Sequence, residues 1–109
     1  MLSTHVLDTS TGRPGERIPV ELVRIDGDAR TPVATAVTDA DGRTAAPLGD
    51  ALAPGIYELV FSVAPYFAAR NVPSFYDRIA VRFRIDDARA KYHVPLLVAP
   101  WGYSTYRGS

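Results

Sequence analysis

The side chains best suited to proton transfer in this sequence are two histidines, accompanied by arginines near turns. His5 and His93 are the only histidines, and both fall in segments with a strand-like pattern. A neutral imidazole near its ordinary pKa of about 6.5 can accept a proton at neutral pH. Arg43 directly follows an Asp-Gly turn, where its planar guanidinium can be aimed at a carbonyl group or an anion. Taken one at a time, such residues are more often strand-edge or solvated groups, so the residues alone leave their role open.

The end of the sequence carries a second group of polar side chains. A largely apolar and aromatic run, residues 92–105, leads directly into Tyr106, Arg107, Gly108 and Ser109, where the sequence ends. Chain ends are usually frayed, but a run of this kind so close to the end favours a docked segment. We therefore expect an arginine, a hydroxyl and a free carboxylate in fixed positions. The alternative is a last strand followed by a solvated tail.

Most familiar catalytic and cofactor-binding motifs are absent. The sequence has no Gly-x-Ser-x-Gly elbow, no phosphate-binding loop and no His-x-x-x-His pair. Because it has no cysteine, it offers no disulfide, no thiolate nucleophile and no cysteine-ligated zinc. Asp39 and Asp41 lie close together beside Gly42, but they lack the pattern of a calcium loop and indicate a capped turn. The residues therefore carry no metal or cofactor motif.

Length and charge limit the class of protein. A sequence of 109 residues has the size of one domain, so we expect residues 1–109 to form a single domain with one core. Lysine plus arginine and aspartate plus glutamate number 12 each, and the zero net charge argues against nucleic acid or an acidic membrane as the main partner. No segment has the pattern of a signal peptide or the length of a membrane span, which makes a cytoplasmic protein the expectation.

The dominant hydrophobic period is two, which predicts β-strands. In residues 79–85, for example, four apolar side chains alternate with alanine and arginine, the pattern of a half-buried strand. The segments with strand patterns are 3–8, 18–25, 33–38, 56–63, 79–85, 92–99 and 102–106, with a further short piece around Leu48. Turn signals separate them, and residues 65–70 predict one short helix that Asn71 can end in a left-handed conformation. Seven to eight short strands and one helix predict an all-β, two-sheet β-sandwich.

Four runs of sequence match, in order, one known family. The runs are Leu2-Ser3-Thr4-His5-Val6-Leu7-Asp8-Thr9 with Thr11-Gly12-Arg13-Pro14, Thr38-Asp39-Ala40-Asp41-Gly42-Arg43, Tyr92-His93-Val94-Pro95-Leu96-Leu97, and Gly102-Tyr103-Ser104-Thr105-Tyr106-Arg107-Gly108-Ser109. They resemble the 5-hydroxyisourate hydrolases, the enzymatic relatives of transthyretin, and the last run matches the signature that separates these hydrolases from hormone-carrying transthyretins. The resemblance spans the whole sequence. Its departures, Trp101 in place of an expected phenylalanine and Ala64-Pro65 at the helix start, touch no expected site residue.

The resemblance implies a transthyretin-like, immunoglobulin-like sandwich of two four-stranded sheets that assembles as a homotetramer, a dimer of dimers. It implies active sites in the channel between the dimers, which would let His5 and His93 converge although they lie far apart in the sequence. The implied reaction is hydrolysis of 5-hydroxyisourate, in which water opens the six-membered ring at a cyclic amide bond. The product is 2-oxo-4-hydroxy-4-carboxy-5-ureidoimidazoline, a step of urate degradation that uses neither a metal nor an organic cofactor.

The resemblance also implies roles for individual residues. His5 and His93 activate water and polarise the substrate, and the sequence leaves open which of them is the base. Arg43 stabilises the oxyanion or orients the substrate. The end of the substrate pocket is formed by Tyr106, Arg107 and Ser109. At this end, the hydroxyl or the carboxylate of the last residue helps to place the attacking water.

Two other functions fit a sandwich of this size. The first is a transthyretin-like carrier that holds a small aromatic ligand in the same channel without catalysis. The segment Tyr106-Arg107-Gly108-Ser109 argues against it, since the resemblance places these polar groups across the channel. The second is a structural or adhesive sandwich domain, which usually belongs to a longer, secreted chain, whereas no signal peptide is visible here. The hydrolase is therefore the favoured function.

Overall fold

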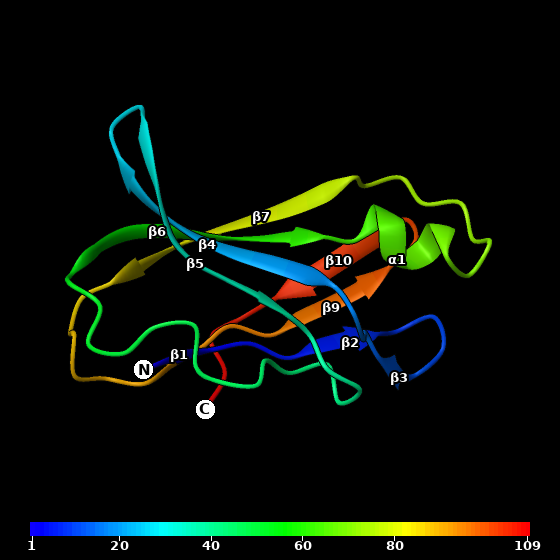
Figure 1. The fold of residues 1–109 in the computed structure, drawn as a ribbon, viewed down its shortest axis with the longest axis horizontal. Helices are drawn as coiled ribbons and strands as arrows, with labels where there is room; N and C mark the ends of the chain where they lie inside the picture. The colour runs from blue at the N-terminus through cyan, green and yellow to red at the C-terminus, as the bar shows by residue number, and fades with distance from the viewer.

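Two four-stranded β-sheets pack face to face in the computed structural model, which describes residues 1–109 (Figure 1). The first sheet is antiparallel, in the order β5 (Ala29–Val37), β4 (Pro19–Asp26), β6 (Gly55–Ser62) and β7 (Arg78–Ile85). The second sheet has the order β10 (Gly102–Thr105), β9 (Leu96–Ala99), β2 (Val6–Asp8) and β3 (Arg13–Pro14). The remaining elements are the parallel pair β1 (Leu2–Ser3) and β8 (Tyr92–His93), and helix α1 (Ala64–Ala68). The expected two-sheet sandwich with one short helix is confirmed.

The structure divides this sandwich into ten strands, where the sequence predicts seven to eight. The expected strands 3–8 and 92–99 are each interrupted, the second next to Pro95, which has no N–H group to donate to a ladder. Arg13–Pro14 adds a short strand that pairs with β2. The expected piece around Leu48 pairs only through an isolated bridge. These differences concern strand ends and interruptions, and they leave the two layers unchanged.

Strand β5 and helix α1 also have different ends from those expected. β5 is an edge strand that begins at Ala29, and a register shift opposite Leu22 and Val23 accommodates Pro32 within it. α1 contains five residues, and Asn71 beyond it has a φ of 57°, the left-handed conformation expected from the sequence. No helix of the chain is long and apolar enough to cross a membrane.

One continuous parallel register joins the start of the chain to residues 92–98. The paired residues include Leu2 with Tyr92, Ser3 with His93, Val6 with Leu96 and Asp8 with Val98. Backbone hydrogen bonds from Val94 to Ser3 (3.0 Å) and from Leu96 to His5 (2.9 Å) carry the ladder across the interruption. The buried Thr4 hydroxyl donates to the Val94 carbonyl oxygen at 2.7 Å. The parallel pairing therefore holds the segment that contains His5 next to the segment that contains His93.

A core of 19 buried apolar residues lies between the sheets, with Phe61 and Phe67 as its largest fully buried side chains. One buried carboxylate, that of Asp8, stands at its edge and accepts a hydrogen bond from the Tyr66 hydroxyl at 2.8 Å. The Ser10 hydroxyl donates to the same carboxylate at 2.6 Å. These bonds fasten α1 to the end of β2, so the helix covers the core at one end of the sandwich.

An ion triad stabilises the outer face of the first sheet. Glu58 on β6 lies between Arg82 on β7 and Arg30, which reaches across β4 from β5, with both nitrogen–oxygen distances at 2.8 Å. The Glu58 side chain is only 8% exposed. Burial opposes its ionisation, but the hydrogen bonds and positive charges of the two arginines outweigh burial and lower the pKa of Glu58. The carboxylate therefore stabilises the fold in its charged form.

Replacing Glu58 by glutamine is expected to lower the free energy of unfolding at neutral pH by about 1–3 kcal/mol, since charge-assisted hydrogen bonds are lost. Because the folded-state pKa of Glu58 lies below the unfolded value of about 4.3, this stabilisation is complete above that value and is lost as the pH falls through the folded pKa. Urea denaturation across a pH series tests both statements. A difference between wild type and Glu58→Gln that stays constant into strong acid would contradict the charged role.

Candidate active site

Residues singled out in the sequence gather on the outer face of the second sheet, beside the parallel register. Ser3 and His93 are register partners, and His5 forms an isolated antiparallel bridge with Arg43. Ser3 and His5 are half-buried, whereas Thr4 between them is buried. Since successive side chains of a strand point to opposite faces, Ser3 and His5 both face away from the core. The structure thus brings together two histidines and an arginine from three separate segments of the chain.

A tight turn holds Arg43 beside His5. The Asp39 carboxylate accepts hydrogen bonds from the backbone N–H groups of Asp41 at 2.9 Å and Arg43 at 3.1 Å. Gly42 has a φ of 76°, which favours glycine, and a Cβ at this position would overlap the Val6 carbonyl oxygen. The capped turn expected from the sequence is confirmed. It keeps the Arg43 side chain exposed at the edge of the site.

The His5 ring is oriented by a backbone group of the same turn. Its Nε2 atom lies 2.9 Å from the Asp41 carbonyl oxygen. Because a carbonyl oxygen only accepts hydrogen bonds, His5 must carry a proton on Nε2 to make this bond. In the neutral ring the lone pair is then on Nδ1. Nε2 therefore anchors the His5 ring to the turn, and Nδ1 makes no hydrogen bond within the chain.

The His93 ring lies in a more shielded position. Its Nδ1 atom is 2.9 Å from the Ser3 hydroxyl oxygen. Burial lowers the pKa of His93, and the positive charges of Arg43 and His5 lower it further. His93 is therefore neutral at neutral pH, as a general base must be before it accepts a proton. The influence of Arg43 and His5 on this pKa also means that the three side chains share one electrostatic environment.

The C-terminal segment runs back against His93. The Gly108 N–H donates to the His93 carbonyl oxygen at 2.6 Å, and the two residues form an isolated antiparallel bridge. In Figure 1 this red segment lies close to the blue strand β1. A Cβ at Gly108 would lie only 2.5 Å from Cδ2 of the His93 ring. Only glycine leaves room for the ring in its present position.

The side chains of Tyr106 and Arg107 lie apart from the surface that carries His5 and Arg43. The Arg107 guanidinium lies 4.4 Å from the centre of the Tyr92 ring and donates to the Lys91 carbonyl oxygen at 3.0 Å. Tyr106, Arg107 and Tyr92 line a cavity of about 290 Å³ between the C-terminal segment and β7. Within one chain, these two side chains therefore do not join the surface formed by His5, Arg43 and His93. Ser109, which follows Gly108, is exposed.

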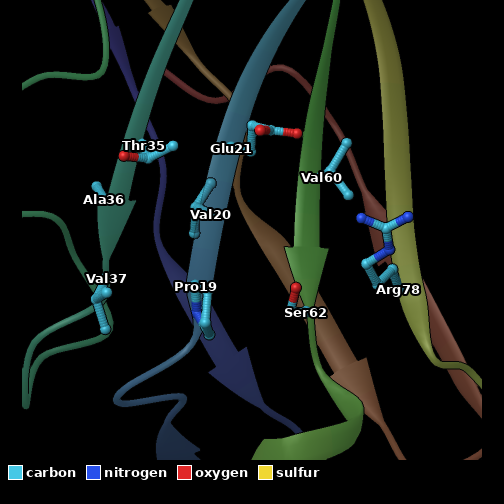
Figure 2. Close-up of a pocket in the computed structure, with 9 residues that line it drawn as sticks. All are labelled: Pro19, Val20, Glu21, Thr35, Ala36, Val37, Val60, Ser62 and Arg78. Atoms are coloured by element: carbon cyan, nitrogen blue, oxygen red, sulfur yellow. The ribbon is translucent and has the colours of Figure 1, made fainter. Parts of the chain in front are cut away.

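A larger hollow, of about 530 Å³, lies on the outer face of the other sheet. Figure 2 shows its side chains on β5, β4, β6 and β7, with the charged groups of Glu21 and Arg78 flanking Val60. It contains no histidine and is formed by the sheet opposite to the one that carries His5. No group of three or more His, Asp or Glu side chains in the chain is placed to hold a metal ion. Both histidines therefore lie at the surface that also carries Arg43.

Replacing Gly108 by alanine is expected to lower the catalytic rate of the chain by up to about 10²-fold, because the new methyl group displaces the His93 ring, and displacements of about 1 Å have effects of this size. The thermal midpoint of unfolding should change little. Gly102→Ala is the matched control, since a Cβ at Gly102 meets no atom within 4 Å. Equal rates in the two variants would contradict the positioning role of Gly108.

The two-sheet sandwich, with histidines and an arginine on the outer face of one sheet, defines a protein of the transthyretin-like class. The chain belongs to the HIUase/Transthyretin family, whose pattern matches residues 2–108. It is 52% identical over 113 residues to the 5-hydroxyisourate hydrolase of Deinococcus radiodurans, covering 99% of this chain and 95% of the relative.

Solved structures agree with this membership. The Klebsiella pneumoniae 5-hydroxyisourate hydrolase superimposes with a TM-score of 0.86 at 42% identity, over 99% of this chain and 98% of the other. An (S)-allantoin synthase superimposes with a TM-score of 0.90 at 41% identity. The match covers 99% of this chain but only 43% of the synthase chain. The fold of this family is therefore also found as one part of a longer protein.

Ser3 and Gly108 are the site residues that the sequence did not assign to a role. Both stand inside the runs that carry the family resemblance, and Ser3 shares a strand face with His5. This shared face is the sequence feature from which a role for Ser3 beside the histidines could have been predicted. The contact of Gly108 with His93 has no comparable local signal, because it joins residues from two segments that pair only in the folded chain.

Proposed function

We propose that this chain hydrolyses 5-hydroxyisourate, opening its six-membered ring at a cyclic amide bond. The observation that carries the proposal is the placement of a neutral His93 imidazole on the same face as His5 and Arg43. Membership of a family whose similar members are named 5-hydroxyisourate hydrolases supplies the substrate class. The product is 2-oxo-4-hydroxy-4-carboxy-5-ureidoimidazoline.

In this proposal His93 is the general base. A water molecule held against the substrate carbonyl carbon gives one proton to Nε2 of His93 while its oxygen forms the new C–O bond. The carbonyl oxygen becomes an oxyanion, which the exposed Arg43 guanidinium stabilises. When the tetrahedral centre collapses, the ring C–N bond breaks and the proton passes from His93 to the leaving nitrogen. His5, anchored through Nε2, orients the substrate by accepting a hydrogen bond from a ring N–H group at its Nδ1 atom.

The C-terminal residues complete the proposed pocket. Ser109 directly follows Gly108, which contacts His93, and this neighbourhood supports a role for the Ser109 hydroxyl or carboxylate in orienting the water. Tyr106 and Arg107 remain proposed contributors to substrate binding. The stacking of Arg107 on Tyr92 supports an additional role, in which it holds residues 106–109 against His93.

We further propose a homotetramer, a dimer of dimers, with the reaction in the channel between the dimers. β7 and β10 are edge strands of the two sheets, and unpaired edges are templates for pairing with another chain. Leu7 and Leu97 are half-buried on the outer face that carries His5, which suits a face that is covered on assembly. Residues 1–109 form a single domain in this assembly, and a cytoplasmic location remains part of the proposal.

The direct test generates 5-hydroxyisourate in situ with urate oxidase and follows the decay of its ultraviolet absorbance with and without the protein. We expect clear acceleration of the decay over the spontaneous rate, and sedimentation should give the mass of four chains. If the folded protein leaves the decay unchanged, the hydrolase proposal fails, and binding of small aromatic ligands in the channel becomes the next measurement.

A further inference from the structure

Ser3 is the side chain in direct contact with the ring of the proposed base. Its hydroxyl oxygen lies 2.9 Å from Nδ1 of His93, and a hydrogen bond with the Ser3 backbone also acts on the ring. We propose that Ser3 is a positioning residue that holds His93 in the tautomer with its proton on Nδ1 and its lone pair on Nε2. The inference deepens the proposed hydrolysis and rests on it for the role of His93.

The contact is set by the backbone register. Ser3 and His93 are partners in the parallel pair of β1 and β8. The Val94 N–H donates to the Ser3 carbonyl oxygen at 3.0 Å, and the neighbouring Thr4 hydroxyl donates to the Val94 carbonyl oxygen at 2.7 Å. These two bonds lock the strands on either side of the contact. The hydroxyl therefore stands opposite the ring as a consequence of the fold.

The ring is held from two sides. In an imidazole, Nδ1 and Cδ2 are the two atoms next to Cγ, on opposite edges of the ring. Ser3 contacts Nδ1, and Gly108 lies against Cδ2 so closely that no Cβ fits between them. Rotation of the ring about the Cβ–Cγ bond would break both contacts. The far end of the ring, which carries Nε2, is left without a partner in the chain and is free to meet a water molecule.

The direction of the hydrogen bond follows from the reaction that His93 has to perform. A serine hydroxyl can donate or accept, but both nitrogens of a protonated imidazole are donors. If Ser3 donated to Nδ1, that bond would be broken as soon as the ring accepted a second proton, and the neutral ring would hold its proton on Nε2. If Ser3 accepts from Nδ1, the bond persists while Nε2 takes the proton from water. Only the second arrangement serves a general base.

Serine also suits the charges around the ring. Burial lowers the pKa of His93, the positive charges of Arg43 and His5 lower it further, and the hydrogen bond with the Ser3 backbone opposes them. A carboxylate in place of the hydroxyl would counteract them and favour the protonated ring. A neutral acceptor fixes the tautomer without adding charge, so His93 stays neutral and basic at neutral pH.

The test compares Ser3→Thr with Ser3→Val, which have the same shape and differ by one hydroxyl group. Ser62→Ala is a control, because Ser62 is half-buried on the other sheet and its hydroxyl makes no hydrogen bond within the chain. Nitrogen-15 NMR of the imidazoles reports which nitrogen of His93 carries the proton, and steady-state kinetics separates kcat from KM. We expect the threonine variant to keep the Nδ1–H tautomer and most of the activity. The valine variant should shift toward the Nε2–H tautomer that free imidazole side chains favour in water.

In the valine variant we expect kcat to fall by about 10–100-fold, the range known for removing the partner that orients a metal-binding histidine. KM should change little, because the replaced hydroxyl contacts the His93 ring. An unchanged tautomer in Ser3→Val, or equal losses in the threonine and valine variants, would overturn the proposal. Absence of hydrolysis by the wild type would instead overturn the proposed function, while the NMR comparison still decides whether Ser3 sets the tautomer.

Discussion

Replacing His93 by alanine is expected to lower kcat for 5-hydroxyisourate hydrolysis by about 10²–10⁴-fold, the usual contribution of a general base. Burial and the nearby positive charges keep His93 neutral, and its Nε2 has no partner within the chain. The water molecule in the variant would have to lose its proton to bulk solvent. The decay of 5-hydroxyisourate absorbance, measured with saturating substrate, gives this loss directly, and circular dichroism confirms that the β-sandwich is retained.

The pH dependence of the same reaction is a second readout for His93. Because its pKa is lowered, the group accepts protons only in more acidic solution than an ordinary histidine, whose pKa is about 6.5. Activity should therefore be level at neutral pH and fall as the pH drops through the lowered pKa. This acid limb should be missing from whatever activity remains in His93→Ala. His5→Ala is the matched variant, and a greater loss of kcat there than in His93→Ala would assign the base to His5 instead.

Most of the sandwich could be predicted because its strands have local patterns. The alternation in residues 79–85 depends only on neighbouring side chains, and β7 occupies nearly those residues. The turn before Arg43 was predictable for the same reason, since glycine and aspartate act on their own backbone. The interruptions at Thr4 and Pro95 were not predicted, because both segments keep a strand-like period while their hydrogen bonds go to a distant partner.

The candidate site could be predicted only in part. The resemblance selected His5, Arg43 and His93, and the structure brings these three together. Which groups touch the rings depends on a parallel register between segments about 90 residues apart, and nothing in the local sequence sets this register. The contact between Ser3 and His93 was missed for that reason. Arg107 was placed in the pocket by its position in the last run, whereas its stacking on Tyr92 depends on the three-dimensional path of the segment.

The substitution Arg43→Lys is expected to lower kcat by about 10²–10³-fold, the effect of removing one preorganised donor from a developing oxyanion. Lysine keeps the positive charge but loses the planar fork of donors, so the field at His93 changes little while the geometry at the oxyanion is lost. The turn itself should survive, because Asp39 binds the backbone N–H at position 43 and not the side chain.

The matched control for this substitution is Arg89→Lys. Arg89 also lies in an aspartate-capped turn, with its backbone N–H bonded to Asp87 and its side chain 92% exposed, but its guanidinium pairs with the Asp87 carboxylate at 3.6 Å. We expect Arg89→Lys to have wild-type kinetics. A rise in KM at unchanged kcat in Arg43→Lys would assign Arg43 to ground-state binding, and full activity would remove it from the mechanism. A fall in kcat alone means that the guanidinium acts after the substrate is bound, when the charge develops on the carbonyl oxygen.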